Sequence, residues 1–536
     1  MMQHYDSYRY ETNPPVNGGT RWASDDEIQE ALSKVNLFER HYAACGLPLI
    51  CDGHSAYVNN TDSHSLIIGS TGSKKSRLFV MPMLQMIARA GESVIVTDPK
   101  GELYDRSSGL FAREGYRIQV LNFRDPMHSN GWNPLYTAYL MDKMGEHDKA
   151  LQMFADISAF LYADKPGSKQ DPFWNQKSRS IFQGLCQLML EDPNIQKSQI
   201  SFSTLAELMS NITDDVAPPP TAVMDIVRRE LPPDSLARKK LLEGMLGSEK
   251  TILNVTTSML APFDIFFTSR SLMKMLATPE IDFREIGMKK TALFIIMPDE
   301  KTTLHALVGM AIKNCYEMLI DAAQYQRNKT LPVRVNYLLD EFSNIPTIPD
   351  MSSMITAARS RNIRFYLIVQ SMQQLYSKYG EEAHTLRGNC NDWVFLTSRE
   401  LSLLQELESL CGSDVKTGQP LITVSQLQRL NKESGEALVL CGRMYPYLTH
   451  LPDIDGYPFA DVPPVPLPNL PELRCEPFSF EEYVDRWTVS GFSLPNRRNE
   501  SEDIFRFGPD DDDQEDNDLY ERLDQKFQAL YGKKSD

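Results

Sequence analysis

The residues of this sequence with the clearest chemistry form a glycine-rich turn between an apolar run and a helical pattern. The turn consists of Gly69, Ser70, Thr71, Gly72, Ser73, Lys74, Lys75, Ser76 and Arg77. Such a turn aims backbone N–H groups at one point, where the N-terminus of the following helix adds partial positive charge. We expect phosphate to bind there, with Lys75 reaching the β- and γ-phosphates and the Ser76 hydroxyl ligating Mg²⁺. An ordinary surface turn is the alternative.

One residue of the turn departs from the pattern G-x-x-x-x-G-K-[ST], because Lys74 stands where the pattern has its second glycine. Glycine at that place allows the backbone to approach phosphate closely or to adopt a positive φ. A side chain there costs about 1 kcal/mol if φ is positive. The additional ammonium attracts phosphate and offsets part of that cost. We therefore expect phosphate binding to survive and the catalytic geometry to suffer.

Two adjacent carboxylates follow a second apolar run, far along the chain. The segment VNYLLDEFSNIP places Asp340 and Glu341 directly after the run. Two carboxylates in such a place are costly to bury unless a charged group meets them. We expect Asp340 to hold Mg²⁺ through water and Glu341 to polarise the attacking water. The alternative for Asp340 is a strand-end residue that caps the next turn.

Further polar candidates flank the apolar run IRFYLIVQS. Gln370 follows this run, where its amide could orient water or sense the γ-phosphate, although a plain polar residue at a strand end is the alternative. Arg359, Arg361 and Arg364 lie at its other end. One of them could reach the nucleotide of a neighbouring subunit as an arginine finger. Surface ion pairing is the more ordinary role for any single arginine.

The elements that must position these residues alternate between short apolar runs and helical patterns from residue 65 onward. The runs are SLIIG, SVIVTDPKG, YRIQVLNF, TALFIIMPD, RVNYLLDEF, IRFYLIVQS, DWVFLTS and EALVLCG. Runs of this length and composition are typical of strands buried on both faces of a parallel sheet, with crossover helices between them. The sequence therefore predicts a doubly wound α/β fold.

The rest of the chain divides around this pattern. Only helical periodicity is found between about Ala138 and Glu285, which predicts a separate all-α domain grown from a loop. Near the N-terminus, a helix is expected over about 24–41, with Ser24 as its cap and Glu27 three residues on. After about Pro446 the chain is Pro-rich, consistent with an extended arm packed on the surface or a semi-rigid linker.

The C-terminal part contains the run PDDDDQEDND, which is expected to be disordered, and a short amphipathic helix over 519–531. The predicted domains are an N-terminal extension over 1–60, a first part of the nucleotide-binding domain over 61–137, the inserted all-α domain over 138–285, a second part of the nucleotide-binding domain over 286–457, and the Pro-rich arm, acidic run and amphipathic helix over 458–536.

Length and charge limit the possible functions. The chain has 536 residues, with 55 Lys+Arg against 72 Asp+Glu and a formal charge of −17. The length favours two or three domains, and the negative field disfavours non-specific wrapping of nucleic acid without excluding a local basic channel. No stretch approaches the roughly 20 apolar residues that span a bilayer, so we expect a cytoplasmic protein. Its 8 scattered cysteines, with no C-x-x-C pair, predict reduced and mostly buried thiols.

Taken in order, these motifs resemble those of the TraG/TraD-type coupling proteins of conjugative type IV secretion, particularly forms from Gram-positive mobile elements. The resemblance covers the chain from about Gly19 to Tyr457. Besides the two nucleotide motifs, it rests on GTRWAS, TDPKGELYDRSSGLFAREGYRIQVLNFRDPMHSNGWNPL, DPFWNQKSRSIFQGL, LFIIMPDEKTT and SRNIRFYLIVQSMQQLYSKYG.

The resemblance implies a RecA-like P-loop ATPase core with an inserted all-α domain, ATP and Mg²⁺ as cofactors, and homo-hexamers that pump single-stranded DNA with its attached relaxase towards a membrane channel. The residues that match the family's nucleotide site are Lys75, Ser76, Asp340, Glu341 and Gln370. Arg359 best matches an arginine placed before that glutamine, and Asp98 and Lys100 lie in a DPKGE turn at the carboxyl end of the second strand.

The resemblance also sets an expectation about location. Many of these proteins begin with transmembrane helices, which this sequence lacks, so association with the inner face of the cell membrane is expected through a membrane-embedded type IV secretion subunit. The basic clusters Arg228-Arg229, Arg238-Lys239-Lys240 and Lys289-Lys290 suit DNA phosphate contacts and equally suit a solvated helix face.

Three functions are open from the sequence. The first is an ATP-dependent motor that delivers DNA for conjugation. The second is a non-hydrolysing or weakly hydrolysing adaptor that recruits relaxase or effector proteins through the helical insert and the tail, a function that Lys74 favours. The third is a double-strand DNA translocase of the FtsK/HerA type, against which the helical insert and the DPKGE turn argue.

Overall fold

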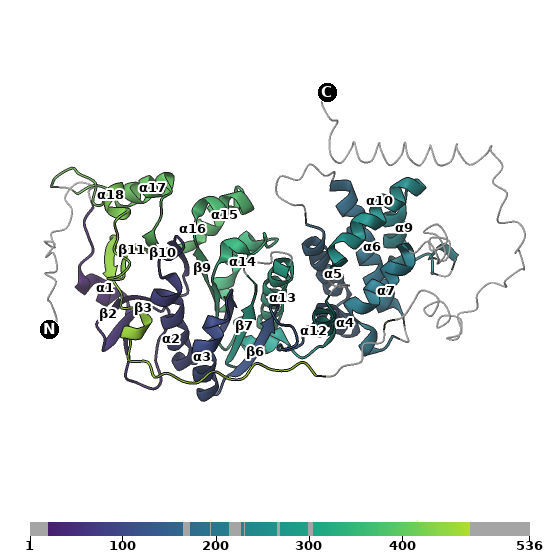
Figure 1. Ribbon diagram of the computed structural model, residues 1–536, viewed down its shortest axis with the longest axis horizontal. Coiled ribbons are helices and arrows are strands. Elements are labelled where there is room, and N and C mark those ends of the chain that lie inside the picture. The colour runs from purple at the N-terminus through teal and green to yellow at the C-terminus, as the bar shows by residue number, and fades with distance from the viewer. Residues whose placement is uncertain are drawn as a thin grey trace, which may run out of the picture. The chain divides into compact units, whose positions relative to one another are not determined.

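A nine-stranded sheet forms the core of the molecule (Figure 1). The computed structural model describes residues 20–163, 172–192, 195–213, 227–229, 231–264, 269–298, 304–414, 416–471 and 477. The strand order is β12-β11-β10-β4-β9-β8-β5-β7-β6. These strands are β4 (His64–Gly69), β5 (Ser93–Asp98), β6 (Arg117–Asn122), β7 (Thr291–Ile296), β8 (Val335–Leu339), β9 (Ile363–Val369), β10 (Cys390–Thr397), β11 (Glu436–Cys441) and β12 (Tyr447–His450).

The sheet is mostly parallel. Every pairing from β10 through β4, β9, β8, β5 and β7 to β6 is parallel, whereas β11 and β12 are added antiparallel at one edge. All residues of β4, β5, β7, β8 and β9 are buried, as expected for strands covered on both faces. The predicted α/β class is therefore confirmed.

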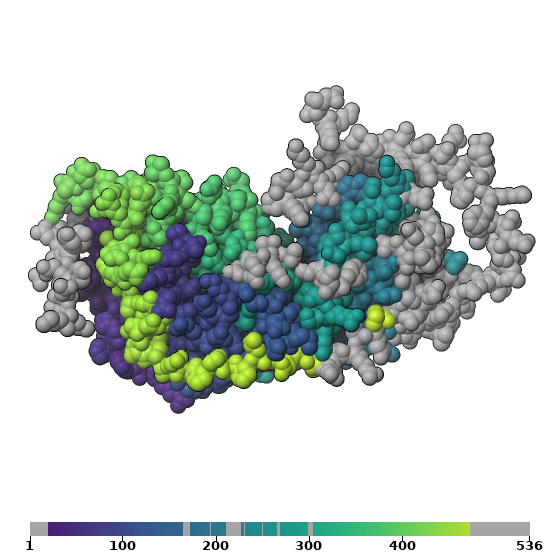
Figure 2. All heavy atoms as spheres, in the orientation of Figure 1, coloured from purple at the N-terminus to yellow at the C-terminus, as the bar shows by residue number. Residues whose placement is uncertain are grey.

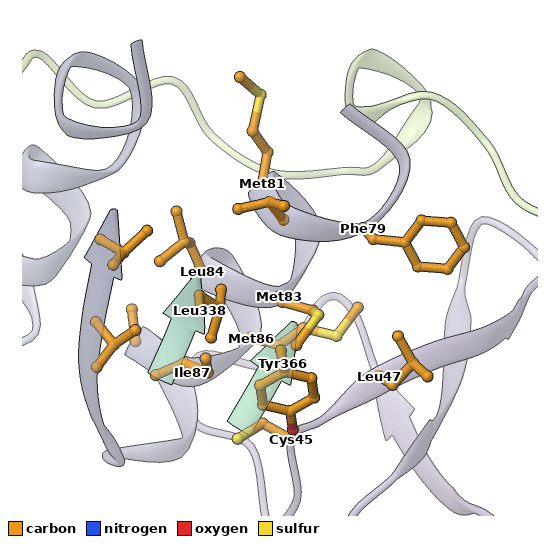
Figure 3. Packing of buried hydrophobic residues seen from close by; sticks show 14 of the residues in the cluster. Cys45, Leu47, Phe79, Met81, Met83, Leu84, Met86, Ile87, Leu338 and Tyr366 are labelled. Carbon is orange, nitrogen blue, oxygen red and sulfur yellow. The ribbon is translucent and has the colours of Figure 1, made fainter. Parts of the chain in front are cut away.

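Alternate side chains of the central strands enter two different cores. Leu338 and Tyr366 pack against Met83 and Ile87 of the helix that follows the glycine-rich turn (Figure 3). Tyr337 and Phe365 point to the opposite face, where their rings stack 4.7 Å apart. The helical segments beside the sheet are η1 (Ser76–Val80), α2 (Met81–Ala90), α3 (Glu102–Arg113), α13 (His305–Gln324), η6 (Phe342–Asn344), α14 (Met351–Ala358), η7 (Arg359–Arg361), α15 (Met372–Tyr379), α16 (Glu382–Asn389), α17 (Leu401–Cys411), α18 (Val424–Leu427) and η8 (Ile454–Gly456).

The N-terminal part contains a second, smaller sheet that the sequence pattern did not predict. The expected helix is α1 (Asp25–Ala31), which is capped by Ser24 and Glu27 as predicted but ends well before residue 41. It is followed by a three-stranded antiparallel sheet in the order β1-β3-β2. The strands are β1 (Ser33–Asn36), β2 (Leu47–Cys51) and β3 (Ser55–Asn59). Burial of Val35 and Leu37 in the core against α2 overrides the helical pattern there.

Between β6 and β7 the described residues are helical and contain no strand. The helices are α4 (Pro134–Lys143), α5 (His147–Leu161), α6 (Pro172–Glu191), η2 (Lys197–Gln199), α7 (Phe202–Thr213), α9 (Leu236–Met245), α10 (Glu249–Leu260), η3 (Ala261–Phe263), α12 (Arg270–Ala277) and η4 (Phe283–Gly287). The predicted helical content is confirmed, while the boundaries 138 and 285 stay predictions. The first helix begins at Pro134 because the Asn133 side chain accepts hydrogen bonds from the backbone N–H groups of Leu135 and Tyr136.

The Pro-rich segment after residue 457 is an arm that lies along α3 (Figure 2). The Tyr104 hydroxyl donates to the Val465 carbonyl at 3.1 Å, and the Val465 N–H donates to the Ser108 hydroxyl at 3.1 Å. Gly109 makes this approach possible, because a Cβ there would lie 2.0 Å from the Pro463 carbonyl oxygen. Of the two alternatives, the surface-packed arm is confirmed. The acidic run and the helix expected over 519–531 lie outside the described residues.

Two further expectations concern thiols and membrane spans. The seven cysteines within the described residues are all free, and six of them are buried. They agree with the predicted reduced thiols. None of the helices in the described part of the chain is both long enough and apolar enough to cross a membrane.

The close fit at Gly109 gives the first prediction. Gly109→Ala should release the arm and lower the free energy of unfolding by about 1–3 kcal/mol, because the added methyl overlaps a backbone carbonyl. Limited proteolysis should then cleave the segment 460–471, and urea unfolding measures the loss. Gly388→Ala is the matched control, since a Cβ at this helical glycine meets nothing within 4 Å. An arm that stays protected in Gly109→Ala would contradict the assigned packing.

Candidate nucleotide-binding site

The glycine-rich turn follows β4 directly, because Gly69 is the last residue of that strand. The Ser70 N–H donates to the Thr397 carbonyl of β10 at 3.0 Å, which ties the start of the turn to the adjoining strand. Gly72 and Lys74 both have positive φ, 76° and 65°. Lys74 therefore adopts the left-handed conformation that makes a side chain costly at this position.

Ser73 turns into the protein. Its N–H donates to the Ser70 carbonyl at 3.1 Å, and its side chain is buried against Gly69, where a Cβ would lie 2.5 Å from the Ser73 oxygen. That hydroxyl has no hydrogen-bond partner among the described residues. A buried polar atom without a partner is uncommon and needs an explanation, which a ligand at this turn would supply.

Lys75 is a buried cation at the start of the helix. Its ammonium donates to the Gly69 carbonyl at 2.6 Å, the one hydrogen bond that it makes within the described part of the chain. Burial lowers the pKa of Lys75, and the negative charges of Glu341 and Asp340 oppose that shift. A desolvated ammonium without a directly bonded anion fits a phosphate oxygen as its missing partner.

The two halves of the predicted site meet at Ser76 and Asp340. The Ser76 hydroxyl donates to Asp340 Oδ2 at 2.8 Å, although the residues are 264 positions apart. Burial raises the pKa of Asp340 to about 6, while the hydrogen bond from Ser76 lowers it and the charge of Glu341 raises it. A hydroxyl and a carboxylate side by side form the oxygen donor set that Mg²⁺ prefers. The residues present therefore fit a magnesium ion.

Glu341 and Gln370 are joined to the glycine-rich turn by a chain of hydrogen bonds. The Gln370 Nε2 donates to Glu341 Oε2 at 2.6 Å, and the Thr71 hydroxyl donates to Gln370 Oε1 at 2.9 Å. Glu341 has a φ of 54°, a left-handed conformation that is rare outside glycine and recurs at functional sites. Gln370 thus sits where an amide can orient the Glu341 carboxylate.

Asp98 lies at the end of β5, beside β8. It accepts hydrogen bonds from the backbone N–H groups of Gly101 at 2.8 Å and Tyr104 at 2.9 Å, and so fixes the turn into α3. Burial raises the pKa of Asp98 to about 6, those N–H groups lower it, and the charge of Asp340 adds a smaller increase. Lys100 is exposed in the same turn.

The three candidate arginines divide into different roles. Arg364 is 1% exposed and binds the Glu92 carboxylate at 2.6 Å, so it is structural and cannot extend to another subunit. Arg359 and Arg361 form η7, which precedes β9, whereas Gln370 follows that strand. Arg359 therefore lies at the amino-terminal end of β9, whereas the glycine-rich turn follows the carboxyl end of the parallel neighbour β4. At this position Arg359 pairs with Asp62 at 2.9 Å.

Some residues of this site could not be found from the sequence. The Thr97 hydroxyl donates to the Asp340 backbone carbonyl at 2.7 Å and holds the acidic pair against β5. The Lys74 ammonium, which the sequence assigned to phosphate, binds Glu433 Oε2 at 2.5 Å and lies 3.8 Å from Asp453 Oδ2. These carboxylates lie more than 350 positions from Lys74, and no local pattern marks them.

The candidate DNA clusters are partly engaged in the fold. The Lys290 ammonium donates to the Glu114 carbonyl at 2.6 Å, and Arg238 donates to the Leu231 carbonyl at 3.2 Å. Lys240 lies 3.5 Å from Glu243, whereas Lys239 is exposed. Lys290 is nevertheless exposed, as is Lys239 of the α9 cluster, so both clusters keep charge at the surface.

The profile of a family described as type IV secretory system conjugative DNA transfer matches residues 21–409. The chain belongs to this family. The matched range includes the glycine-rich turn, the helical insert and the acidic pair. The resemblance to TraG/TraD-type proteins is therefore confirmed at the level of the family, and the chain is a coupling protein of conjugative type IV secretion.

Individual relatives are distant but similar over long ranges. A conjugal transfer protein TraG from Escherichia coli is 22% identical over 441 residues, which cover 77% of this chain and 67% of that protein. A protein VirD4 from Rhizobium radiobacter is 23% identical over 387 residues, 69% of this chain and 51% of that one. The coupling protein TraD from Escherichia coli K12 is 22% identical over 369 residues, with 69% and 45% covered.

Solved structures share the fold. The plasmid coupling protein TrwB in complex with a non-hydrolysable ATP analogue superposes with a TM-score of 0.60 at 14% identity, covering 86% of this chain and 99% of that one. TrwB in complex with ADP and Mg²⁺ gives a TM-score of 0.59 at 15% identity, with the same coverage. The predicted RecA-like core with an all-α domain is confirmed at the level of the fold.

The raised pKa of Asp340 gives the second prediction. The folded state favours the protonated form, so the stability that this preference contributes is present below pH 4 and is lost as the pH rises through about 6. Asparagine cannot ionise. Asp340→Asn should therefore stabilise the nucleotide-free protein by about 3 kcal/mol at pH 7 and by less than about 1 kcal/mol at pH 4. Urea unfolding at the two pH values measures this, and an equal gain at both would contradict the assigned cause.

Proposed function

We propose that this chain is an ATP-dependent motor that delivers relaxase-bound single-stranded DNA to a type IV secretion channel during conjugation. The hydrogen bond between Ser76 and Asp340 carries the proposal, because it brings the glycine-rich turn and the acidic pair to one place. Membership of the conjugative DNA transfer family supports the DNA substrate. TrwB, whose fold is similar, has been solved with ADP and Mg²⁺, which supports the choice of cofactor.

The proposed chemistry assigns a role to each polar group. The backbone N–H groups of the turn, from Gly69 to Arg77, and the Lys75 ammonium bind the β- and γ-phosphates, while Ser76 and Asp340 hold Mg²⁺. Bound Mg²⁺ supplies charge neutralisation on the phosphate oxygens. The Glu341 carboxylate accepts the proton of the attacking water, and Gln370 holds that carboxylate in position by donating to Oε2.

In this proposal the nucleotide site is complete only when subunits assemble. Arg359 lies at the amino-terminal end of β9, away from its own glycine-rich turn, so its cation is assigned to the nucleotide of a neighbouring subunit. We therefore propose a homo-hexamer in which Arg359 leaves Asp62 when subunits meet. The exposed Lys239 is offered as a DNA phosphate contact. Contact with membrane-embedded secretion subunits would place the protein at the inner face of the cell membrane.

An adaptor that recruits relaxase or effector proteins without hydrolysis is the second candidate. The left-handed Lys74, at the position of the loop glycine, favours it because a strained loop loses catalytic precision before it loses binding. The two candidates share the nucleotide site and differ in turnover.

The third prediction separates them. Purified wild-type chain should release phosphate from Mg-ATP, and single-stranded DNA should accelerate release. Glu341→Gln should retain nucleotide binding and lose about 10²–10⁴-fold in turnover, since it removes the general base, and Lys75→Ala should lose binding and DNA transfer. Phosphate release, with a mating assay for transfer, measures these effects.

Lys34→Ala, at an exposed lysine of β1, is the control and should behave as wild type. Unchanged DNA transfer in Lys75→Ala would remove the motor. If neither wild type nor Lys74→Gly turns over ATP with DNA present, the adaptor function replaces it.

A further inference from the structure

Three carboxylates from distant segments of the chain contact cations of the glycine-rich turn, and we call them the acidic bracket: Glu433, Asp453 and Asp455. Glu433 lies in the connection before β11, and the two aspartates lie in and beside η8, after β12. The bracket contacts both cations on the outer side of the turn, Lys74 and Arg77.

The contacts are specific. The Lys74 ammonium lies 2.5 Å from Glu433 and 3.8 Å from Asp453. The Arg77 guanidinium donates from Nε to Asp453 at 2.9 Å and from Nη2 to Asp455 at 2.5 Å. Asp453 thus faces both cations, and hydrogen bonds from Arg77 hold the pKa of its carboxyl below the usual range. Lys432 adds a contact of 3.4 Å from its ammonium to the Gly72 carbonyl.

We infer that Lys74 is a positioning residue, which acts through the acidic bracket and makes no contact with phosphate. This inference rests on the proposed nucleotide-binding function and concerns how the turn keeps its shape. With φ at 65°, Lys74 stands in a left-handed conformation that costs a non-glycine residue about 1–2 kcal/mol. The ion pairs to Glu433 and Asp453 hold the side chain outward, so the backbone N–H groups of the turn stay convergent before nucleotide arrives.

A direct contact between Lys74 and phosphate would predict the opposite change in nucleotide affinity. If the ammonium served phosphate directly, Glu433 would compete for it, and neutralising Glu433 would tighten nucleotide binding. If Lys74 acts through the bracket, neutralising Glu433 releases the turn and weakens binding. Glu433 is a suitable probe because its side chain is 66% exposed, so its replacement leaves no cavity.

Binding of a fluorescent ADP derivative with Mg²⁺ to the full chain is the test. It is measured at about 0.3 M salt, where a Debye length of roughly 6 Å suppresses long-range effects of the charge change. Glu433→Gln should weaken binding about threefold, within the range of an exposed ion pair, and Asp453→Asn should weaken it more because it holds both cations. Lys74→Ala keeps the strained backbone and removes the ammonium, so in that background Glu433→Gln should change nothing.

Two further variants test the contributions of backbone strain and of overall charge to nucleotide binding. Lys74→Gly should bind more tightly than Lys74→Ala, since glycine adopts the left-handed conformation without strain. Asp461→Asn, at an exposed carboxylate outside the bracket, is the charge control and should bind as wild type. Tighter binding in Glu433→Gln, or an equal effect of Glu433→Gln in the wild-type and Lys74→Ala backgrounds, overturns the inference. A wild-type chain that binds no nucleotide overturns the proposed function itself, so the two failures are distinct.

Discussion

The structure depends on the burial of one ammonium and two carboxylates at the carboxyl ends of the central strands. Lys75, Asp340 and Asp98 are all buried, and burial shifts the pKa of each towards its neutral form. Their mutual attraction repays only part of the cost of removing them from water. The rest of that cost must be met by the packing of the sheet, whose central strands are covered on both faces.

The strand order explains why these residues meet. Strands β4, β9, β8 and β5 are consecutive neighbours and all run in parallel, so their carboxyl ends lie at one edge. Gly69, Gln370, Asp340 and Asp98 each stand at one of those ends. The connections that follow differ in rigidity: Asp98 fixes its own turn by backbone hydrogen bonds, whereas Lys74 needs distant carboxylates. The site is thus built from the ends of four strands, together with the distant Glu433 and Asp453 carboxylates that contact Lys74.

Local patterns account for what the sequence could predict. Each central strand is an apolar run followed by a polar residue. The parallel sheet and the polar residues at the ends of its strands could therefore be predicted from the sequence alone. The strands Leu47–Cys51 and Ser55–Asn59 were missed because they are short and lie in polar, turn-rich sequence. Their pairing and their burial in a core that includes α2 select them. Thr97 and Glu433 were missed for another reason. Their importance lies entirely in a partner hundreds of positions away, and neither residue type is unusual where it stands.

The helical insert is linked to the segment that follows Glu341 by residues on one face of α13. His305 bonds to the Asn344 carbonyl at 3.0 Å, and a Cβ at Gly309 would lie 2.9 Å from Phe160 of α5 and 3.7 Å from Ile345. One turn further on, the buried Lys313 ammonium binds Asp156 of α5 at 2.8 Å and Asp350 at 2.9 Å. A third acidic side chain, Glu317, lies 3.7 Å from the same ammonium, and removal of Asp156 would leave this buried cation less well compensated. Because the segment 342–350 begins directly after Glu341, α5 and the Glu341 carboxylate are connected through α13 and this segment.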